Sequence, residues 1–317
     1  MRALDPPQAV QAARAGDRRA LGRLISAVEE RTDAAAEIGR LLPPGHAHVV
    51  GITGAPGVGK STTTAGLIER WRAQGLTVAV IAVDPSSPFT GGALLGDRVR
   101  MGAHTTDPGV YIRSMAARGQ LGGLSAATPA AVRVLAGCGF DIVLIETVGV
   151  GQSEVDIVRY ADTVVILQAP GMGDRVQATK AGLMEIGDVF AVNKSDRPGA
   201  AATKRELLAM VASKPLEPQA WRPPVIPITA TNGSGLDELV TAIAEHRRYG
   251  AASGETAQRR RDRTVAEIVG LAIGRLQQDL QRRREVLEGL ADDVLAARVD
   301  PSQAAQQLLI RFDGGEL

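Results

Sequence analysis

Cysteine is almost absent from this chain of 317 residues, and aromatic side chains make up only 3% of it. Because Cys138 has no second cysteine to pair with, the sequence excludes an internal disulfide. The four histidines, His46, His48, His104 and His246, are scattered, so the sequence shows no clustered site for a soft metal. A lone cysteine in such a chain more often packs than reacts.

The chain also lacks an excess of charge of either sign. It has 36 basic and 35 acidic residues, so its net charge is +1. Proteins that bind nucleic acids or membrane surfaces usually carry a basic excess or a basic patch. We therefore expect neither kind of partner. No amino-terminal stretch joins a basic region to a long apolar run, so we expect neither export nor membrane insertion, and a cytoplasmic location follows.

Lysine is rare among the basic residues, most of which are arginine. The five lysines are Lys60, Lys180, Lys194, Lys204 and Lys214. A compact ammonium and a forked guanidinium are not interchangeable at a phosphate. Three of the five lysines lie in the motifs described below.

Apolar residues make up 44% of the chain, which is enough to bury a full core. Between His46 and about Ala244, short runs rich in β-branched residues alternate with helical stretches. The runs cover residues 48–53, 77–84, 110–113, 141–146, 162–168, 188–193 and 224–229. This alternation predicts an α/β fold with a mainly parallel sheet and helices on both faces. Ligands of such folds bind beyond the carboxyl ends of the strands.

Helical segments extend the predicted sheet domain at both ends. We expect an amino-terminal helical extension over residues 1–45, a nucleotide-binding domain over 46–250 and a carboxyl-terminal helical arm over 251–317. In the arm, Val265, Ile268, Ala272, Leu276 and Leu280 keep a helical spacing. From the residues alone, this stripe either folds back on the sheet domain or packs against a second copy of the chain.

The stretch GITGAPGVGKSTTT, residues 51–64, has the spacing of a phosphate-binding loop. In such loops backbone N–H groups surround the phosphates, the lysine reaches the outer ones and the hydroxyl ligates Mg²⁺. A predicted strand precedes the loop and a predicted helix follows it, so a helix N-terminus faces the anion. The predicted phosphate-binding residues are Gly54, Ala55, Pro56, Gly57, Val58, Gly59, Lys60, Ser61 and Thr62.

The string NKSD, residues 193–196, follows the sixth predicted strand. At that edge the Asp196 carboxylate can accept hydrogen bonds from N1–H and N2–H of guanine, which adenine does not offer. Asn193 can brace the loop, and the stem of Lys194 can cover the base. The loop after the seventh strand can offer backbone amides to the guanine oxygen through Thr229, Ala230 and Thr231. The sequence thus predicts GTP or GDP as the bound nucleotide.

Acidic residues end two of the predicted strands. Asp84 and Glu146 occupy these ends, and Asp97 follows a glycine-rich loop. Together with Ser61 they would form the hard oxygen shell that Mg²⁺ prefers. Gly149 can present its N–H to the γ-phosphate. For Asp84, which precedes Pro-Ser-Ser, turn chemistry is the alternative.

Five segments, GITGAPGVGKST, AVDPSSPFTGGALLGDRVRM, IETVGVGQSE, GMGDRVQATKAGLMEI and AVNKSD, occur in this order. They closely resemble the methylmalonyl-CoA mutase-associated GTPases, the MeaB/ArgK family, over nearly the whole chain. The resemblance implies a P-loop GTPase that acts as a chaperone for an adenosylcobalamin-dependent acyl-CoA mutase. Such a chaperone gates cofactor loading and protects or reactivates the mutase. The resemblance also implies a homodimer formed through the carboxyl-terminal helices.

The resemblance further implies roles for individual residues. It places a mobile switch at about 170–182 and hydrolysis-linked cations at Arg100 and Lys180, which spacing alone would not reveal. With Lys60, Asp84 and Glu146 these form the expected catalytic set.

Two departures from related sequences affect the expected hydrolysis. Relatives usually carry an acidic residue after the switch aspartate, whereas this chain has Arg175 after Asp174. Ras-like GTPases place a water-orienting glutamine directly after the glycine that corresponds to Gly149. This chain has Val150 there and Gln152 two residues later, so we expect slow hydrolysis without a partner.

Two other functions share parts of this pattern. A nickel-insertion GTPase metallochaperone would share the sheet and the guanine motif, but it needs a Cys/His cluster, and the lone Cys138 argues against it. A kinase or transport-associated NTPase is the other alternative. The guanine motif at 193–196 and the lack of a transmembrane run argue against that function.

Overall fold

The computed structural model describes residues 4–30, 32–84, 104, 106–116, 127–147, 156–171, 185–213, 217, 219–282 and 284–313. Contacts divide the chain into two compact units, Met1–Arg263 and Thr264–Leu317. The division falls within one long helix, α11, Glu255–Arg282. Each unit is described by itself below.

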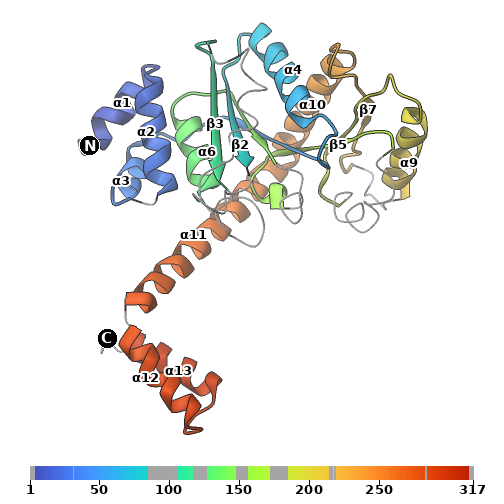
Figure 1. The fold of residues 1–317 in the computed structure, drawn as a ribbon. Coiled ribbons are helices and arrows are strands. Elements are labelled where there is room, and N and C mark those ends of the chain that lie inside the picture. The colour runs from blue at the N-terminus through green and yellow to red at the C-terminus, as the bar shows by residue number, and fades with distance from the viewer. Residues whose placement is uncertain are drawn as a thin grey trace. The chain divides into compact units, whose positions relative to one another are not determined.

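The first unit contains a seven-stranded sheet in which every neighbouring pair is parallel, with the order β3-β2-β4-β1-β5-β6-β7 (Figure 1). Its strands are β1 His48–Thr53, β2 Val78–Asp84, β3 Val110–Ala116, β4 Ile142–Glu146, β5 Thr163–Gln168, β6 Val189–Val192 and β7 Val225–Pro227. These are the seven runs that the sequence predicts, so the predicted α/β fold is confirmed. Parallel strands need crossover connections, and among the described residues α-helices lie in those after β1, β3 and β6.

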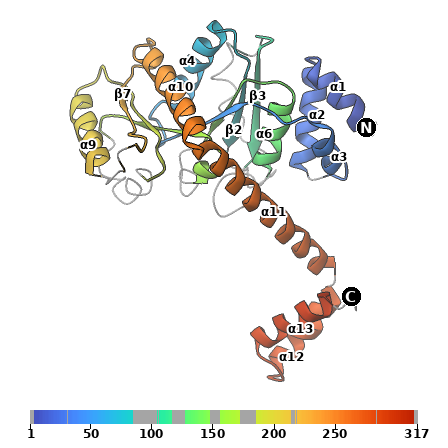
Figure 2. The same cartoon turned by 180° about the vertical axis from the view of Figure 1, so that it is seen from behind.

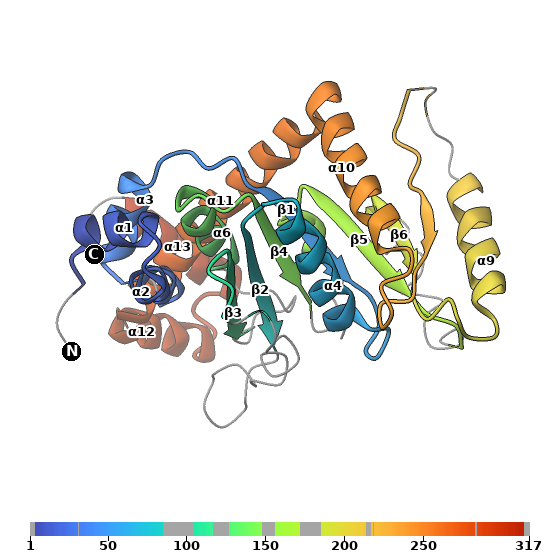
Figure 3. The same cartoon turned by 90° about the horizontal axis from the view of Figure 1, so that it is seen from above.

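Helices cover both faces of the sheet (Figure 3). One face packs against α4, Lys60–Ala73, and α10, Leu236–Ser253, and the other against α6, Thr128–Gly137. Alternate residues of β2 point to opposite faces of the sheet. Val78 and Val80 pack in one core, and Ala79 and Ile81 pack in the other. The strands are therefore apolar on both sides, as a covered parallel sheet requires. Beyond β6, α9, Ala200–Ser213, lies beside β7 (Figure 2).

Three amino-terminal helices belong to the same compact unit as the sheet. They are α1 Pro6–Arg14, α2 Arg18–Glu29 and α3 Ala34–Leu41. Asp17 caps α2 by accepting hydrogen bonds from the backbone N–H groups of Arg19 and Ala20. From β3, Arg113 donates to Glu29 of α2 at 2.9 Å. This bond, together with the apolar face of α2, fixes these helices to the sheet edge.

The amino ends of β5 and β6 are held by the first turns of α11. Asp162, directly before β5, accepts hydrogen bonds from Arg260 at 2.7 Å and Arg263 at 3.0 Å. Asp188, directly before β6, accepts two from Arg259, at 2.7 and 2.8 Å. All five residues lie in the first unit. We call them the amino-edge clamp.

Two backbone N–H groups complete the clamp. Val49 donates to Asp162 at 3.1 Å, and Val164 donates to Asp188 at 2.8 Å. Burial by itself raises the pKa of Asp162, but the hydrogen bond from Arg260 and the charges of Arg263 and Arg260 outweigh it, so the pKa is lowered. Asp162 is therefore ionised while it is almost fully buried. The guanidinium groups that compensate its charge come from the first turns of α11.

The second unit contains the rest of α11, then α12, Arg284–Leu295, and α13, Pro301–Asp313. Helices α12 and α13 pack against each other. Of its described apolar residues, only Leu290 and Ala304 are buried. Val265, Ile268 and Val269, spaced i, i+3 and i+4 on α11, are 51–61% exposed, and we call them the arm stripe. Among the described residues, no helix combines the length and the apolar composition that crossing a membrane requires.

Candidate nucleotide-binding site

The phosphate loop joins β1 to α4 at the carboxyl edge of the sheet. β1 lies between β4 and β5; from β1 the chain goes on to β2 on one side, and from β5 it goes on to β6 on the other, so a ligand crevice is expected beyond the ends of these strands. Gly54 and Gly59 have φ values of +146° and +98°. A Cβ at Gly54 would lie 2.3 Å from the carbonyl oxygen of Leu167, and one at Gly59 2.3 Å from Nδ2 of Asn193. Only glycine therefore fits at either position.

Lys60 begins α4 and is 7% exposed. Its Nζ donates to the carbonyl oxygens of Gly54, at 2.8 Å, and Ala55, at 3.3 Å. The ammonium therefore lies within the loop, next to the first backbone N–H groups of α4, which have no acceptor within the helix. This arrangement combines a positive side chain with a helix N-terminus, and both favour an anion at the same point.

Glu146 ends β4 and is 2% exposed. Its Oε1 accepts a hydrogen bond from the Ser61 hydroxyl at 2.7 Å, and its Oε2 accepts one from the Thr64 hydroxyl at 2.8 Å. Ser61 and Glu146, two of the four residues predicted to hold a metal, are therefore in direct contact. Thr64 was not predicted, although its position three residues after Ser61 on α4 places it on the same helix face.

The donors around Glu146 fit magnesium. They are a carboxylate and hydroxyl oxygens, which are hard ligands of the kind that Mg²⁺ prefers over soft metals. Asp84 is the last residue of β2, and in that strand Ala82 is paired with Glu146 of β4. Asp84 thus lies at the same sheet edge as Glu146. Asp97 falls outside the described residues.

The guanine motif is tied directly to the phosphate loop. Asn193 Nδ2 donates to the carbonyl oxygen of Val58 at 2.7 Å, and its Oδ1 accepts from the backbone N–H of Ala230 at 3.1 Å. Lys194, with a φ of +56°, donates from Nζ to the carbonyl oxygen of Gly57 at 2.7 Å. The structure therefore brings together the loops after β1, β6 and β7, which the sequence assigns to phosphate and base.

Asp196 is exposed, as a residue that meets a base from solvent must be. Thr229 is buried; its hydroxyl lies 2.9 Å from that of Ser195 and donates to Asp196 Oδ1 at 3.5 Å. The following residues, Ala230 and Thr231, continue the same loop, and Thr231 is exposed. These contacts hold the Asp196 carboxylate beside the loop after β7.

Several predicted residues lie outside the described part of the chain. They are Arg100, Gly149 and Lys180, together with Val150, Gln152, Asp174 and Arg175. The described chain leaves β4 through Thr147 and β5 through Ala169 to Gly171. Both segments therefore start from the carboxyl edge that carries the phosphate loop. The roles of these residues remain predictions.

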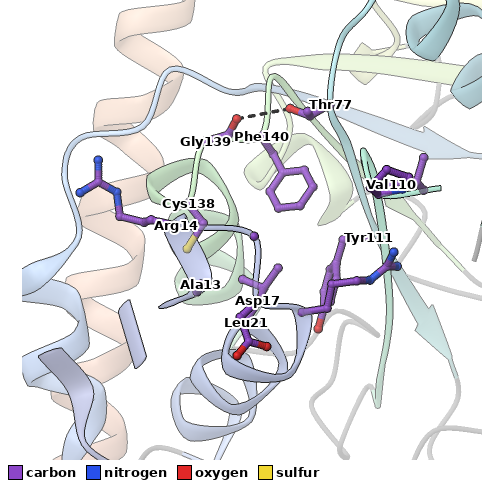
Figure 4. A pocket seen from close by; sticks show the side chains of 13 residues that line it. Ala13, Arg14, Asp17, Leu21, Thr77, Val110, Tyr111, Cys138, Gly139 and Phe140 are labelled. Atoms are coloured by element: carbon purple, nitrogen blue, oxygen red, sulfur yellow. Dashed lines mark hydrogen bonds between the residues drawn. The ribbon is translucent and has the colours of Figure 1, made fainter. Parts of the chain in front are cut away.

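A separate pocket lies between the amino-terminal helices and the sheet edge (Figure 4). Tyr111, Phe140 and Leu21 line it with Cys138, while Arg14 and Asp17 are also at its wall. Burial raises the pKa of Cys138 to about 11, so its thiol stays protonated at neutral pH. This cysteine therefore lacks the thiolate that a nucleophile requires.

One group of histidine and carboxylate side chains in the described residues has the spacing of a metal site. Asp188, His246 and Glu255 place ligand atoms within 4.8 Å of one another. However, Arg259 donates to both oxygens of Asp188 and also to Glu255. The guanidinium already supplies the positive charge that a metal ion would supply. The group therefore does not support the nickel-insertion alternative.

Comparisons with known proteins agree with the geometry of the site. The family described as methylmalonyl Co-A mutase-associated GTPase MeaB matches residues 21–285. A Pyrococcus horikoshii protein named as a GTPase is 50% identical over 303 residues, covering 94% of this chain and 96% of its own. The methylmalonic aciduria type A homolog of Mus musculus, named as mitochondrial, is 36% identical over 269 residues, covering 83% and 65%.

A solved structure shows the same overall likeness. The crystal structure of an LAO/AO transport system kinase is similar with a TM-score of 0.69 and 26% identity, and the match covers 97% of both chains. The likeness therefore extends beyond the sheet to the helical ends of the chain.

Proposed function

Since this chain belongs to the methylmalonyl Co-A mutase-associated GTPases and is a GTP-hydrolysing enzyme, we propose that it is a chaperone for an adenosylcobalamin-dependent acyl-CoA mutase. Methylmalonyl-CoA mutase is the first candidate. In this proposal GTP hydrolysis times cofactor loading and the protection or reactivation of the mutase. The chain acts in the cytoplasm and needs no nucleic acid or membrane.

The observation that supports this proposal most directly is the joining of the phosphate loop to the guanine motif. Asn193 and Lys194 each donate to a carbonyl oxygen of the loop, at Val58 and Gly57. A nucleotide bound across these two segments would be contacted both at its phosphates and at its base. In such an arrangement, loss of the γ-phosphate can change the conformation of the segments around the nucleotide.

The chain's own residues would divide the chemistry as follows. Lys60 and the N-terminus of α4 bind the phosphates and stabilise their charge. Ser61 and Glu146, with Asp84 and Asp97, would hold Mg²⁺, which supplies positive charge at the phosphate oxygens. Asp196 selects guanine. Because Val150 cannot orient a water molecule, hydrolysis by the free chain is slow.

The partner would complete the site through the segment at 170–182. This segment follows β5, whose first residue is next to the amino-edge clamp and whose end borders the phosphate loop. In the proposal the mutase binds this segment and directs Lys180 toward the phosphate, with Arg100 as a second cation. A cation added to this transition state typically raises the rate by orders of magnitude.

The test is GTP turnover with and without purified methylmalonyl-CoA mutase. We expect the mutase to raise kcat by at least about 10-fold, and Lys180→Ala to lose most of that rise while it keeps GTP affinity and mutase binding. Lys204→Ala on α9 is the matched control. Absence of acceleration by the mutase would mean that the partner is wrong, and equal acceleration of Lys180→Ala would remove the role of that lysine.

The carboxyl-terminal helices would form a homodimer. Val265, Ile268 and Val269 expose an apolar stripe, and only two described apolar residues of the second unit are buried. A unit with so small a core needs a partner surface to be stable. A second copy of the chain supplies an identical stripe, which suits a two-fold interface.

A further inference from the structure

The buried carboxylate of Glu146 is held by two hydroxyls of α4, and only one of them has a role in the function proposed above. Ser61 would be a magnesium ligand, whereas Thr64 lies farther along the helix. Building on that proposed magnesium site, we propose that Thr64 is a positioning residue, which fixes the Glu146 carboxylate so that Oε1 stays turned toward Ser61.

The positions of the two hydroxyls support different roles. Ser61 is in the first turn of α4, at the phosphate loop, and Thr64 is three residues later, about 4.5 Å farther along the helix axis. Thr64 is fully buried and therefore does not reach a nucleotide. Its hydroxyl is directed at Glu146 Oε2 at 2.8 Å. Thr64 thus acts on the site only through Glu146.

The hydrogen-bonding capacity of the groups explains why the second hydroxyl matters. A serine hydroxyl has one hydrogen and two lone pairs. When Ser61 donates to Glu146 Oε1, it uses its hydrogen and not its lone pairs, and a cation binds to lone pairs. That orientation depends on Oε1 keeping its place, and the hydrogen bond from Thr64 to Oε2 is one of the contacts that fix the carboxylate.

Removal of the Thr64 hydroxyl would take one hydrogen bond from a charged oxygen in a site that water scarcely reaches, because Glu146 is 2% exposed. Loss of a donor to a buried charged acceptor is penalised, so the carboxylate would turn to improve its remaining hydrogen bonds. The turn would take Oε1 away from Ser61. Groups that orient metal ligands in this way typically affect metal affinity or activity by about 10- to 100-fold.

The neighbouring Thr63 provides a matched control. It is the same residue type, also fully buried, and also in the first turns of α4. Its hydroxyl donates to the carbonyl oxygen of Gly59 at 3.0 Å. Loss of that hydroxyl tests what removing a buried threonine hydroxyl does to the helix, without changing the bond to Glu146.

The experiment compares full-length wild type, Thr64→Val, Thr64→Ser and Thr63→Val. The first readout is the affinity for a fluorescent GDP analogue, titrated with Mg²⁺ and repeated in EDTA. The second is the Mg²⁺ concentration that gives half-maximal GTP turnover. We expect Thr64→Val to need about 10-fold more Mg²⁺ in both assays, with unchanged GDP affinity in EDTA. Thr64→Ser should restore most of the Mg²⁺ affinity, and Thr63→Val should match wild type.

Two results would overturn the inference. One is a Thr64→Val protein with the Mg²⁺ dependence of wild type, and the other is the same shift in Thr63→Val. If Thr64→Val does not fold, Thr64→Ala is measured in its place, because it also removes the hydroxyl. A wild-type protein without any Mg²⁺ dependence would instead refute the proposed magnesium site, so the two failures are distinguishable.

Discussion

At the scale of single residues, Lys194 is the most constrained member of the guanine motif. Its positive φ of 56° is uncommon for a residue with a side chain, and it lets Nζ reach the carbonyl oxygen of Gly57. With Asn193 bound to Val58, the two residues fix the distance between the phosphate loop and the base-reading loop. In the proposed site, this would present Asp196 to the base of a bound nucleotide.

Asp196→Asn should change which base is bound. The amide offers a donor where the carboxylate accepted from guanine, so we expect GTP affinity to fall by at least about 100-fold. Xanthine nucleotides carry an acceptor in place of the guanine amino group and should now be preferred. Competition binding with GTP, XTP and ATP measures both effects. Asp237→Asn, an exposed aspartate on α10, is the control. Equal affinity of the wild type for ATP and GTP would contradict the base assignment.

Sequence reasoning worked at this scale where the spacing is local. The loop residues from Gly54 to Ser61 follow one another in the chain, and the structure places them at a strand end and a helix start. Thr64 was missed because nothing in the sequence pairs it with Glu146, which is 82 residues away. Its i+3 spacing from Ser61 was the only available signal.

At the scale of elements, the amino ends of β1 and β5 and the interior of α10 share one buried hydroxyl. Thr163 Oγ1 lies 2.8 Å from His48 Nε2 and 2.7 Å from His246 Nδ1. Burial is the main cause that lowers the pKa of His48, to about 3; Asp162 opposes the shift, and Arg247, His246 and Arg260 add to it. Burial also lowers the pKa of His246. Both rings are therefore neutral in the folded protein near pH 7.

Stability should fall as the pH drops below about 6.5, where these histidines become protonated in the unfolded chain but not in the folded one. For His48 the window runs from about 6.5 down to about 3, its folded pKa. Each proton bound only by the unfolded state lowers the free energy of unfolding by about 1.4 kcal/mol for each unit by which the pH falls. The free energy of unfolding of His48→Asn, measured with denaturant between pH 5 and 6.5, should depend less steeply on pH than that of wild type. The difference in slope should correspond to about one proton. His46→Asn, the same substitution at an exposed histidine two residues away, is the matched control.

Strands and helices were predictable because β-branched runs and helical spacing are properties of short windows. The seven strands and α4 are all of this kind. The clamp was not predictable, because Asp162 and Arg260 are 98 residues apart and their pairing depends on how β5 and α11 pack. The arginines at the start of the arm are visible in the sequence, but the sequence does not show which carboxylates they pair with.

At the scale of the whole molecule, contacts divide the chain after Arg263, whereas the change in sequence composition predicted a division after residue 250. The intervening residues include Arg259, Arg260 and Arg263, which compensate Asp162 and Asp188. A cut at 250 would leave two buried carboxylates without their cations, at a cost of about 3–5 kcal/mol for each broken pair. A test of self-association should therefore change the surface of the arm and keep its first turns.

Ile268→Asp should give a monomer. Ile268 is 61% exposed in the arm stripe, and an aspartate there would have to be buried opposite its own copy in a two-fold interface. Sedimentation equilibrium measures the mass, and GTP binding should stay as in wild type because the phosphate loop is unchanged. The control is Leu208→Asp, the same kind of change at an exposed leucine of α9. If Ile268→Asp remains dimeric, the interface lies elsewhere.

The amino-edge clamp also sets an order of events during synthesis. Arg260 follows Asp162 by 98 residues, and at about 5–20 residues per second the ribosome needs about 5–20 seconds to make that length of chain. Until then the Asp162 carboxylate has no guanidinium, and desolvation favours keeping it in water. The start of β5 therefore reaches its final burial only after the first turns of α11 have emerged. Completion of the nucleotide-binding unit is a late step of translation, although its phosphate loop is made near the beginning.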